Sequence, residues 1–449
     1  MPPLKTKKPA TKTVPKLRLI YRRVDELKPS PSNPRRHPKW QIRKIVKSIQ
    51  AFGMVVPVLL RSDEIIAGHG RIVACKELGI MEVPTVQLGH LSPEQAKALM
   101  IADNRLTDTS DWDDHLLASE LKELATVDLD FDLEAIGFDM GEIDVLIESL
   151  LDCTPSDNAD QIIVPSEGAP VSRLGDVWIL GDHRVLCGDA TNAQSYEHAI
   201  SGTTAAAVIT DPPYNVPIAG FVSGLGKHKH DDFVMAAGEM SPEEFSGFLY
   251  RVLELLKSSM KSGSLIYLFM DWRSLGLLLN VVSRHSLMLK NICTWSKNQA
   301  GMGSFYRSQT EFCVCCQSGA TRHRNNIQLG KNGRHRTNLW SYPSINTERH
   351  RSEESDLLAL HSTVKPVAMI QDIILDCTAR RDYVLDPFLG SGTTLIAAQR
   401  SGRRCIGIEL DPRYVDTAVR RWERFTGEQA VHESDGKSFA HHAATRSES

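Results

Sequence analysis

The spacing of apolar positions changes along the chain, and these changes predict how the chain divides into domains. From residue 19 to 110, short strand-like apolar runs alternate with runs of helical spacing, which predicts a small α/β domain. Residues 111–152 are acidic with helical spacing and predict a helical extension. From residue 173 to 427, β-branched runs alternate with helical segments, the pattern of a wound parallel sheet. The expected fold class is therefore α/β.

Three stretches lack a regular spacing of apolar residues. Residues 1–18 are rich in Lys, Thr and Pro and predict a disordered basic tail, with an arm that contacts DNA phosphates as the alternative. Residues 153–171 are rich in turn-forming residues and predict a linker. Residues 428–449 are polar and rich in His and Ser, so we expect a loose C-terminal tail.

Glycine and proline mark element ends in the first domain. A helix is expected over residues 40–51, with Gly53 as its stop, and Ser92-Pro93 predicts the start of a later helix. Between them, strands are expected over residues 55–60, 64–67 and 83–86, and a helix over 72–78.

Length, composition and charge narrow the class of protein. A chain of 449 residues exceeds what one core usually serves, and 41% hydrophobic with 24% charged residues is typical of globular domains. The chain has 52 basic and 55 acidic residues, which gives a net charge of -3. Any surface that binds nucleic acid must therefore be a local patch. With no apolar run near membrane length, no secretory signal and nine scattered cysteines, we expect a soluble cytoplasmic protein with reduced thiols.

A glycine loop follows an apolar strand that ends in Asp386. Glycines let a backbone approach a ligand closely, and the helix that follows offers free amide donors. A second strand ends in Glu409, 17 residues beyond Gly392, near the spacing that places an acid on ribose hydroxyls in nucleotide-binding α/β units. Alone, this stretch also suits an ordinary strand–helix turn.

Another strand is expected over residues 207–210. It ends directly before Asp211, and Pro212, Pro213 and Tyr214 come next. The prolines fix φ and remove two N–H donors, so a rigid turn presents a carboxylate and carbonyls without competing donors. Such an acceptor pair suits an exocyclic amine. The alternative is a proline turn with a packed aromatic.

Together these segments resemble the amino-methylating DNA methyltransferases that use S-adenosylmethionine. Residues 211–214 match the family's catalytic signature D/N/S-P-P-Y/F/W, and residues 386–394 match its cofactor signature D-P-F-x-G-S-G-T-T. Lys365-Pro366 and Gly188-Asp189 match two further family elements. The catalytic signature precedes the cofactor signature, as in the β group of the family, and the resemblance covers about residues 173–427.

The resemblance implies a Rossmann-like sheet and methyl transfer to the amine of a base flipped out of double-stranded DNA. Adenine N6 is favoured over cytosine N4, because the D-P-P-Y form is commoner among adenine enzymes of the family. Catalytic roles are implied for Asp211, Pro212, Pro213 and Tyr214. Contacts with S-adenosylmethionine are implied for Asp386, Phe388, Gly390, Ser391, Gly392, Thr393, Glu409, Lys365 and Asp189.

A local basic patch lies between residues 297 and 351, where the family places its target-recognition region. Arg and Asn side chains read base edges, while other Arg and Lys side chains contact phosphates. The DNA contacts expected from this patch are Arg307, Arg322, Arg324, Lys331, Arg334 and Arg336. A charged surface loop is the alternative.

Two other stretches carry residue types that bind metals. Residues 220–232 are glycine-rich and basic, which is typical of a mobile loop that closes over DNA, and they include Lys227-His228-Lys229-His230. Cys313-Val314-Cys315-Cys316 lies in an apolar run and predicts a core strand. Neither has a second cluster at ligand spacing, so no metal site is expected.

Ala67-Gly68-His69-Gly70-Arg71 and Ile101-Ala102-Asp103-Asn104-Arg105 resemble the ParB N-terminal/sulfiredoxin-like domain, over about residues 19–110. The resemblance implies a cleft with Gly68, His69, Arg71, Asn104 and Arg105, in which a helix N-terminus and an Arg cradle a phosphate. Nucleotide binding, nucleotide hydrolysis, DNA positioning and a docking domain with a vestigial cleft all stay open.

Other functions compete with a DNA methyltransferase. One is a ParB-like DNA-binding or partition-type regulator with an inactive methyltransferase fold, against which the intact Asp211, Tyr214, Gly390 and Gly392 argue. Another is an amine methylase acting on RNA or protein, against which the basic patch argues. The recognised sequence, a homodimer and a partner restriction enzyme stay open.

Overall fold

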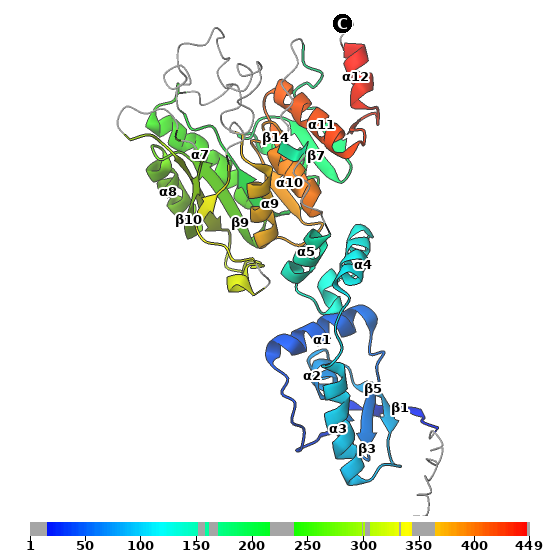
Figure 1. The fold of residues 1–449 in the computed structure, drawn as a ribbon. Coiled ribbons are helices and arrows are strands. Elements are labelled where there is room, and N and C mark those ends of the chain that lie inside the picture. Colours follow the sequence, from blue (N-terminus) through cyan, green and yellow to red (C-terminus); the bar gives the residue numbers. More distant parts are fainter. Residues whose placement is uncertain are drawn as a thin grey trace, which may run out of the picture. The chain divides into compact units, whose positions relative to one another are not determined.

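The computed structural model describes residues 16–150, 158–160, 169–215, 238–298, 300, 306–331, 334–343 and 364–446. The chain divides into two compact units, residues 1–150 and 151–449 (Figure 1). Most of the predicted basic tail, most of the predicted linker and residues 220–232 lie outside the described ranges. Within those ranges, no helix is long and apolar enough to cross a membrane, and every cysteine is a free thiol.

The first unit contains a five-stranded sheet of order β1-β5-β3-β4-β2. Its strands are β1 (Leu19–Arg23), β2 (Lys28–Pro29), β3 (Val58–Arg61), β4 (Glu64–Ala67) and β5 (Glu82–Gln87). Its helices are η1 (Val24–Glu26), α1 (Lys39–Phe52), α2 (His69–Glu77) and α3 (Pro93–Thr107). Gly53 ends α1 with φ 76°, and Ser92 starts α3 with a capping box, so both predicted helix boundaries are confirmed.

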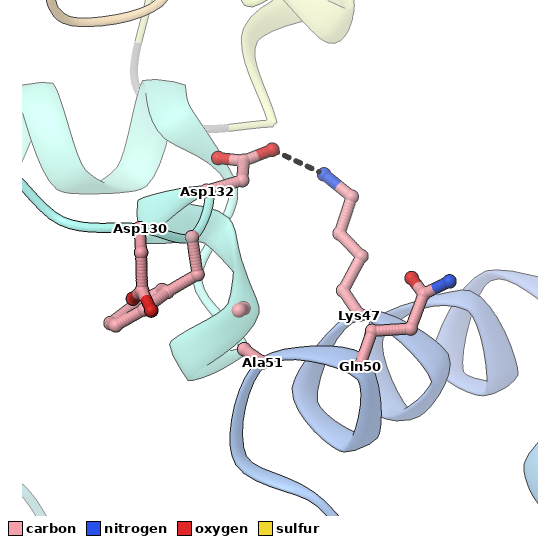
Figure 2. A pocket seen from close by; sticks show the side chains of 7 residues that line it. Lys47, Gln50, Ala51, Asp130 and Asp132 are labelled. Atoms are coloured by element: carbon pink, nitrogen blue, oxygen red, sulfur yellow. Dashed lines mark hydrogen bonds and ion pairs between the residues drawn. The ribbon is translucent and has the colours of Figure 1, made fainter.

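A small helical group follows, made of α4 (Asp114–Thr126), η2 (Leu133–Ile136) and α5 (Met140–Ser149). It has its own apolar core around Leu121 and Ile143, and Lys47 of α1 pairs with Asp132 at 3.0 Å and with Glu134. Figure 2 shows the hollow of about 280 Å³ that Lys47 and Asp132 border. The predicted helical extension is thus a packed group of helices attached to α1.

The second unit is built on a ten-stranded sheet of order β12-β10-β11-β9-β8-β13-β14-β7-β6-β15. Its strands are β6 (Val177–Leu180), β7 (His183–Cys187), β8 (Ala205–Thr210), β9 (Met260–Met270), β10 (Met288–Ser296), β11 (Thr310–Gln317), β12 (Leu339–Ser341), β13 (Tyr383–Asp386), β14 (Arg404–Glu409) and β15 (Val431–His432). Its helices are η3 (Asn158–Asp160), α6 (Ala193–Ile200), α7 (Pro242–Ser258), α8 (Leu275–Arg284), η5 (Gln328–Gly330), α9 (Val367–Cys377), α10 (Thr393–Ser401), α11 (Pro412–Thr426) and α12 (Phe439–Arg446).

Helices cover both faces of this sheet. Buried side chains of α9, α10 and α11 form one core with the strands, and those of α6, α7 and α8 form the other. The five central strands, from β9 to β7 in the order of the sheet, are parallel, as the sequence predicts. Outside this centre, β11 pairs antiparallel with β9 and β10, and β6 pairs antiparallel with β7 and β15, whereas the edge strand β12 pairs parallel with β10. The two residues between β6 and β7 are too few for a parallel crossover.

Two segments predicted to be loose are packed onto the second unit. Residues 428–449 were expected to form a loose tail, but β15 pairs with β6 and Phe439 of α12 packs 5.0 Å from the ring of Trp178. That expectation is wrong for residues 428–446, because one buried aromatic anchors a polar stretch. Within the predicted linker, Ala159 is buried and its carbonyl accepts a hydrogen bond from Arg421 at 2.7 Å.

Candidate active site

The two signature turns leave neighbouring strands at the same edge of the sheet. Strand β8 ends at Thr210, directly before Asp211, and its parallel neighbour β13 ends at Asp386. The Thr210 hydroxyl donates a hydrogen bond of 2.9 Å to Asp386, so the two strand ends are joined directly. In open α/β sheets, ligands bind outside the carboxyl ends of the strands, and both turns lie there.

Asp386 is buried and holds the start of the glycine loop. Its carboxylate accepts hydrogen bonds from the Phe388 amide at 3.1 Å and from the Thr394 hydroxyl at 2.6 Å, besides the one from Thr210. Burial raises the pKa of Asp386 to about 6, although these hydrogen bonds oppose the shift. Phe388 packs its ring 5.8 Å from that of Phe248.

The glycine loop needs glycine where it enters α10. Gly392 has φ 86°, and a Cβ there would lie 3.0 Å from the Cβ of Ala418. Gly390, with φ 54°, donates its amide to Glu409 at 2.8 Å, so the acid at the end of β14 reaches the loop. Burial raises the pKa of Glu409 to about 7.

Arg421 supports the glycine loop from α11, a role that the sequence did not indicate. Its guanidinium donates to the Ser391 carbonyl at 3.1 Å and to the Thr393 hydroxyl at 3.3 Å, and burial lowers its pKa to about 10. Asp189, just beyond β7, lies at the same edge: its neighbour Gly188 donates to the Glu409 carbonyl at 2.8 Å. Its carboxylate accepts from the Thr191 amide at 2.7 Å.

The catalytic turn is organised around the carboxylate of Asp211. One of its oxygens accepts a hydrogen bond of 2.5 Å from the Tyr214 hydroxyl, and the other contacts Lys365 Nζ. Lys365 lies two residues before α9, and its ammonium pairs with Asp211 and Glu311 in this cluster. The cofactor contact that the resemblance implies for Lys365 stays a prediction.

Glu311 and Lys297 complete this cluster, and the sequence reasoning assigned neither a role in it. Glu311 lies 3.1 Å from Lys365 Nζ and pairs with Lys297. Burial would raise the pKa of Glu311, but the charges of Lys365 and Lys297 lower it. Burial raises the pKa of Asp211, which Lys365 opposes and the charge of Glu311 reinforces. A lone acid at the start of the apolar run Phe312–Cys316 was the available signal.

The turn is also fixed on its far side by Asn215, which follows Tyr214. Asn215 has φ 55°, a left-handed conformation that Asn tolerates better than most residues. Its side-chain oxygen accepts from the amides of Gly238 and Met240 at 3.1 and 3.2 Å, and its NH2 donates to the Met240 carbonyl at 2.7 Å. These hydrogen bonds fix the backbone next to Tyr214 and so help to position its ring.

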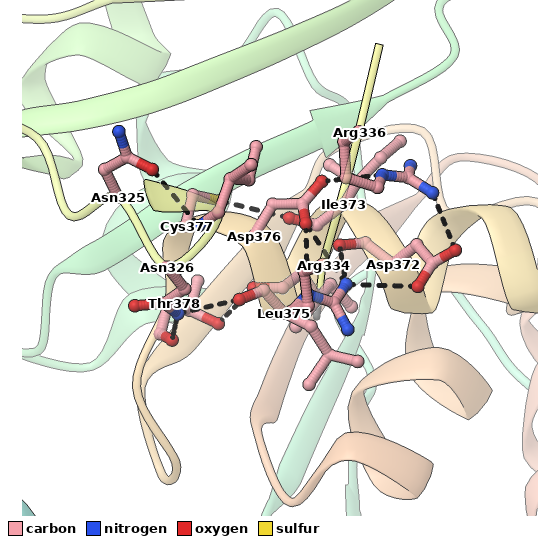
Figure 3. Close-up of polar contacts among 12 residues, drawn as sticks. Asn325, Asn326, Arg334, Arg336, Asp372, Ile373, Leu375, Asp376, Cys377 and Thr378 are labelled. Carbon is pink, nitrogen blue, oxygen red and sulfur yellow. Dashed lines mark hydrogen bonds and ion pairs between the residues drawn. The ribbon is translucent and has the colours of Figure 1, made fainter. Parts of the chain in front are cut away.

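Two of the six expected DNA contacts are held by acids of α9, the buried Arg334 and the half-buried Arg336 (Figure 3). Arg334 donates to Asp372 and Asp376, at 3.1 Å each, and Arg336 pairs with the same acids at 2.8 and 3.2 Å. Arg334 is 8% exposed, so the expectation that it contacts DNA is wrong. Arg336 is also held by its ion pairs with Asp372 and Asp376. The acids belong to α9, which the basic patch does not include.

The other four expected contacts lie nearer to solvent. Arg307, Arg322 and Lys331 are exposed and Arg324 is half-buried, so these four stay predictions. The neighbouring Asn326 is buried, and its side chain donates to the carbonyls of Leu375 and Thr378 at the end of α9. Cys313–Cys316 form part of the buried strand β11, as the sequence predicts.

The first unit has a cleft of about 210 Å³ at the start of α2. Gly68, His69, Arg71 and Asn104 line it, whereas Arg105, on α3, is exposed and not among the lining residues. Arg71 Nε is buried without a hydrogen-bond partner, and burial lowers the pKa of Arg71. Gly68 has φ 105° and lies against the Arg71 guanidinium, since a Cβ there would be 3.2 Å from Arg71 Nη2.

Three family models match successive parts of the chain. The model described as a DNA methylase matches residues 205–420, and the ParB N-terminal domain matches residues 8–104. A ParB-methyltransferase HTH domain matches residues 115–174, which covers the helical group after α3. The sequence reasoning predicted those helices without recognising this domain.

Individual proteins are similar to parts of the chain. The chain is 26% identical over 224 residues to the type II methyltransferase M2.DpnII of Streptococcus pneumoniae, covering 48% of this chain and 81% of the relative. It is 43% identical over 81 residues to the ParB-like nuclease domain-containing protein YnaK of Escherichia coli, covering 18% of this chain and 93% of the relative. The M1.HpyAVI–SAM complex aligns at 22% identity and a TM-score of 0.38, over 53% of this chain and 97% of that chain. Residues 205–420 thus form a domain of the N6/N4 DNA methylases, a family that uses S-adenosylmethionine, and the chain also carries a ParB-like N-terminal domain.

Proposed function

We propose that this protein methylates adenine N6 in double-stranded DNA, at a specific sequence and on a base flipped out of the duplex. The supporting observation is the 2.9 Å hydrogen bond between Thr210 and Asp386, which keeps the catalytic turn beside the cofactor loop. Methyl transfer requires the amine and the donor to meet within a few ångströms, and adjacent strand ends supply that proximity.

The ends of β13 and β14 offer hydrogen-bond acceptors that suit S-adenosylmethionine. Glu409 would hold the ribose hydroxyls, Asp386 the methionine amine, and the Phe388–Gly392 loop the body of the cofactor, whose sulfonium would supply the methyl group. Burial raises the pKa values of both Asp386 and Glu409, so each carboxylate gains from a donor that favours its charged form. Asp189, at the end of β7, completes this side of the site.

The catalytic turn orients the amine. Asp211 and the Pro212 carbonyl accept hydrogen bonds from the two N–H groups, which aims the nitrogen lone pair at the methyl group, while the Tyr214 ring stacks on the base. Stacking of this kind contributes about 1–3 kcal/mol per base. Lys365 and the Tyr214 hydroxyl hold the Asp211 carboxylate in place. Asp211 can also accept the proton that the methylated nitrogen releases.

Transfer of labelled methyl groups to DNA tests this function. We expect incorporation by the wild type and none by Asp211→Ala, with N6-methyladenine as the product in digested DNA. Equal incorporation by both proteins would remove Asp211 from the mechanism, and N4-methylcytosine would replace adenine as the target. Long-read sequencing of a genome modified by the protein would identify the recognised sequence.

A nucleotide at the cleft of the ParB-like domain is a second candidate function. It is supported by Arg71, whose buried Nε has no hydrogen-bond partner and borders the cleft at the start of α2. A helix N-terminus and a guanidinium together bind phosphate well. Nucleotide binding to the full chain should be lost in Arg71→Lys and kept in Arg105→Lys, which changes a residue outside the cleft lining. If the two variants bind alike, Arg71 does not hold the phosphate.

A further inference from the structure

Three side chains with metal-binding groups meet in the C-terminal segment. His432 lies on β15, Asp435 in the turn after it, and His442 on α12. One ligand atom from each lies within 4.8 Å of the others. His442 Nε2 is 3.3 Å from Asp435 Oδ1, and His432 Nδ1 is 3.9 Å from the same oxygen. Two imidazole nitrogens and a carboxylate oxygen therefore converge on one point.

These distances are close to those of a tetrahedral zinc site. Zinc binds His nitrogen and carboxylate oxygen at about 2.0–2.2 Å, so neighbouring ligands in a tetrahedron lie roughly 3.3–3.6 Å apart. The 3.3 Å pair already fits, and the 3.9 Å pair needs a small movement of Asp435, which lies in an exposed turn. The two imidazole nitrogens lie within 4.8 Å of each other, so a bound metal would also draw them closer together. Two His and one carboxylate suit zinc and related transition metals better than calcium or magnesium.

Packing holds the two imidazoles in place. His432 and His442 are 8% and 9% exposed, and their rings meet that of Trp178 edge-on at 5.1 and 5.4 Å. Trp178 is completely buried, and its indole N–H donates to Ser172 Oγ at 2.9 Å. Ligands fixed this way lose little conformational entropy on binding a metal.

A further carboxylate lies on the other side of the His432 ring. Asp176 Oδ1 is 3.3 Å from His432 Nε2, a buried atom that makes no hydrogen bond in this geometry. His432 Nδ1 faces the turn with Asp435 and contacts the Ser434 hydroxyl at 2.9 Å, a contact that a metal would replace. Metal-binding histidines usually donate their second ring N–H to a carboxylate, which fixes the tautomer and makes the ligand more basic. Arg446, which also pairs with Asp176, joins this carboxylate to the end of α12.

We propose that His432, Asp435 and His442 bind a divalent transition metal, with zinc as the best fit. The site would attach the C-terminal segment to the sheet, where β15 contributes only two paired residues to β6. Such a role is structural and separate from the methyl-transfer site. The sequence analysis expected no metal site, because these ligands come from a strand, a turn and a helix and follow no common motif.

The test is metal uptake by the full-length, tag-free protein. Chelator-treated protein is incubated with zinc, desalted, and analysed for bound metal, and cobalt(II) is added separately to record its visible spectrum. We expect about one zinc per chain for the wild type and a tetrahedral cobalt spectrum. His442→Gln should lose both, whereas the control His441→Gln changes the exposed neighbour on the same helix and should keep both.

A second variant guards against misfolding. Asp176→Asn keeps the three ligands but weakens the carboxylate behind His432, and should reduce zinc affinity by roughly 10- to 100-fold. Methyl-transfer activity serves as the folding check for each variant. If the wild type binds no zinc, or if active His442→Gln binds as much as the wild type, the three residues form only an ion-paired cluster and the proposal fails.

Discussion

Two charged clusters in the second unit look alike in composition but differ in what they leave available. The catalytic cluster contains Asp211, Glu311, Lys297 and Lys365, and the α9 cluster contains Asp372, Asp376, Arg334 and Arg336. Each joins two acids to two bases, so charge pairing limits the cost of burial in both. Pairing alone therefore does not reveal which cluster carries chemistry.

The difference lies in position and in neighbours, because exposure alone does not separate the clusters. The side chain of Asp211 is 26% exposed, while those of Asp372 and Asp376 are 32% and 7% exposed. Asp211 follows the end of a parallel strand and lies beside an aromatic ring, while Asp376 and its partners attach residues 334–336 to α9. A carboxylate that a substrate can reach, held by its neighbours, is what amine recognition needs. A carboxylate that is held between two guanidinium groups, such as Asp376, stabilises the fold.

The largest effect should separate the clusters by activity. Asp211→Asn keeps the size of the side chain but removes the charge that accepts the amine, and we expect methyl transfer to fall by about 100-fold or more. Affinity for S-adenosylmethionine should change little, because Asp211 belongs to the catalytic turn. Single-turnover rates and calorimetric cofactor binding measure the two quantities. A parallel loss of cofactor binding would contradict the assignment.

The second effect should separate the clusters by stability. Arg334→Met leaves Asp376 and Asp372 with one cation fewer in a buried site, and should lower the free energy of unfolding by about 3–5 kcal/mol. The control is Arg322→Met, an exposed Arg of the same basic patch, which should change stability by less than about 0.5 kcal/mol. Urea denaturation followed by tryptophan fluorescence measures both. Equal stabilities would show that the α9 cluster holds nothing together.

The sequence predicted the fold class, the parallel centre of the sheet and both signature turns, because these depend on local periodicity and short motifs. It could not pair Glu311 with Lys365 or Arg334 with Asp376, since such partners are distant in the chain and meet only through the sheet order. A basic residue in a polar stretch gives the same sequence pattern whether its side chain faces solvent or pairs with the acids of α9. The Arg421 support of the glycine loop was invisible for the same reason.

A smaller effect should show how the catalytic cluster tunes its carboxylate. Burial and the charge of Glu311 raise the pKa of Asp211, and methyl transfer requires Asp211 to be ionised, so activity should fall as pH decreases through this raised value. Glu311→Gln removes one of the causes. The acidic limb of the kcat/KM profile should therefore move to lower pH, and an unmoved limb would show that Asp211 does not control it.

The smallest effect concerns Glu409, a half-buried carboxylate held by backbone amides instead of a cation. Gly390 and Asp411 donate to it at 2.8 and 2.9 Å, and burial raises its pKa to about 7. Ribose hydroxyls bind the charged form better, so affinity for S-adenosylmethionine should weaken a few-fold as pH falls below about 7. Glu409→Gln should bind more weakly at high pH and lose this pH dependence, as measured by calorimetry. If the dependence persists in Glu409→Gln, another group causes it, and Asp386, with a pKa of about 6, is the next to replace.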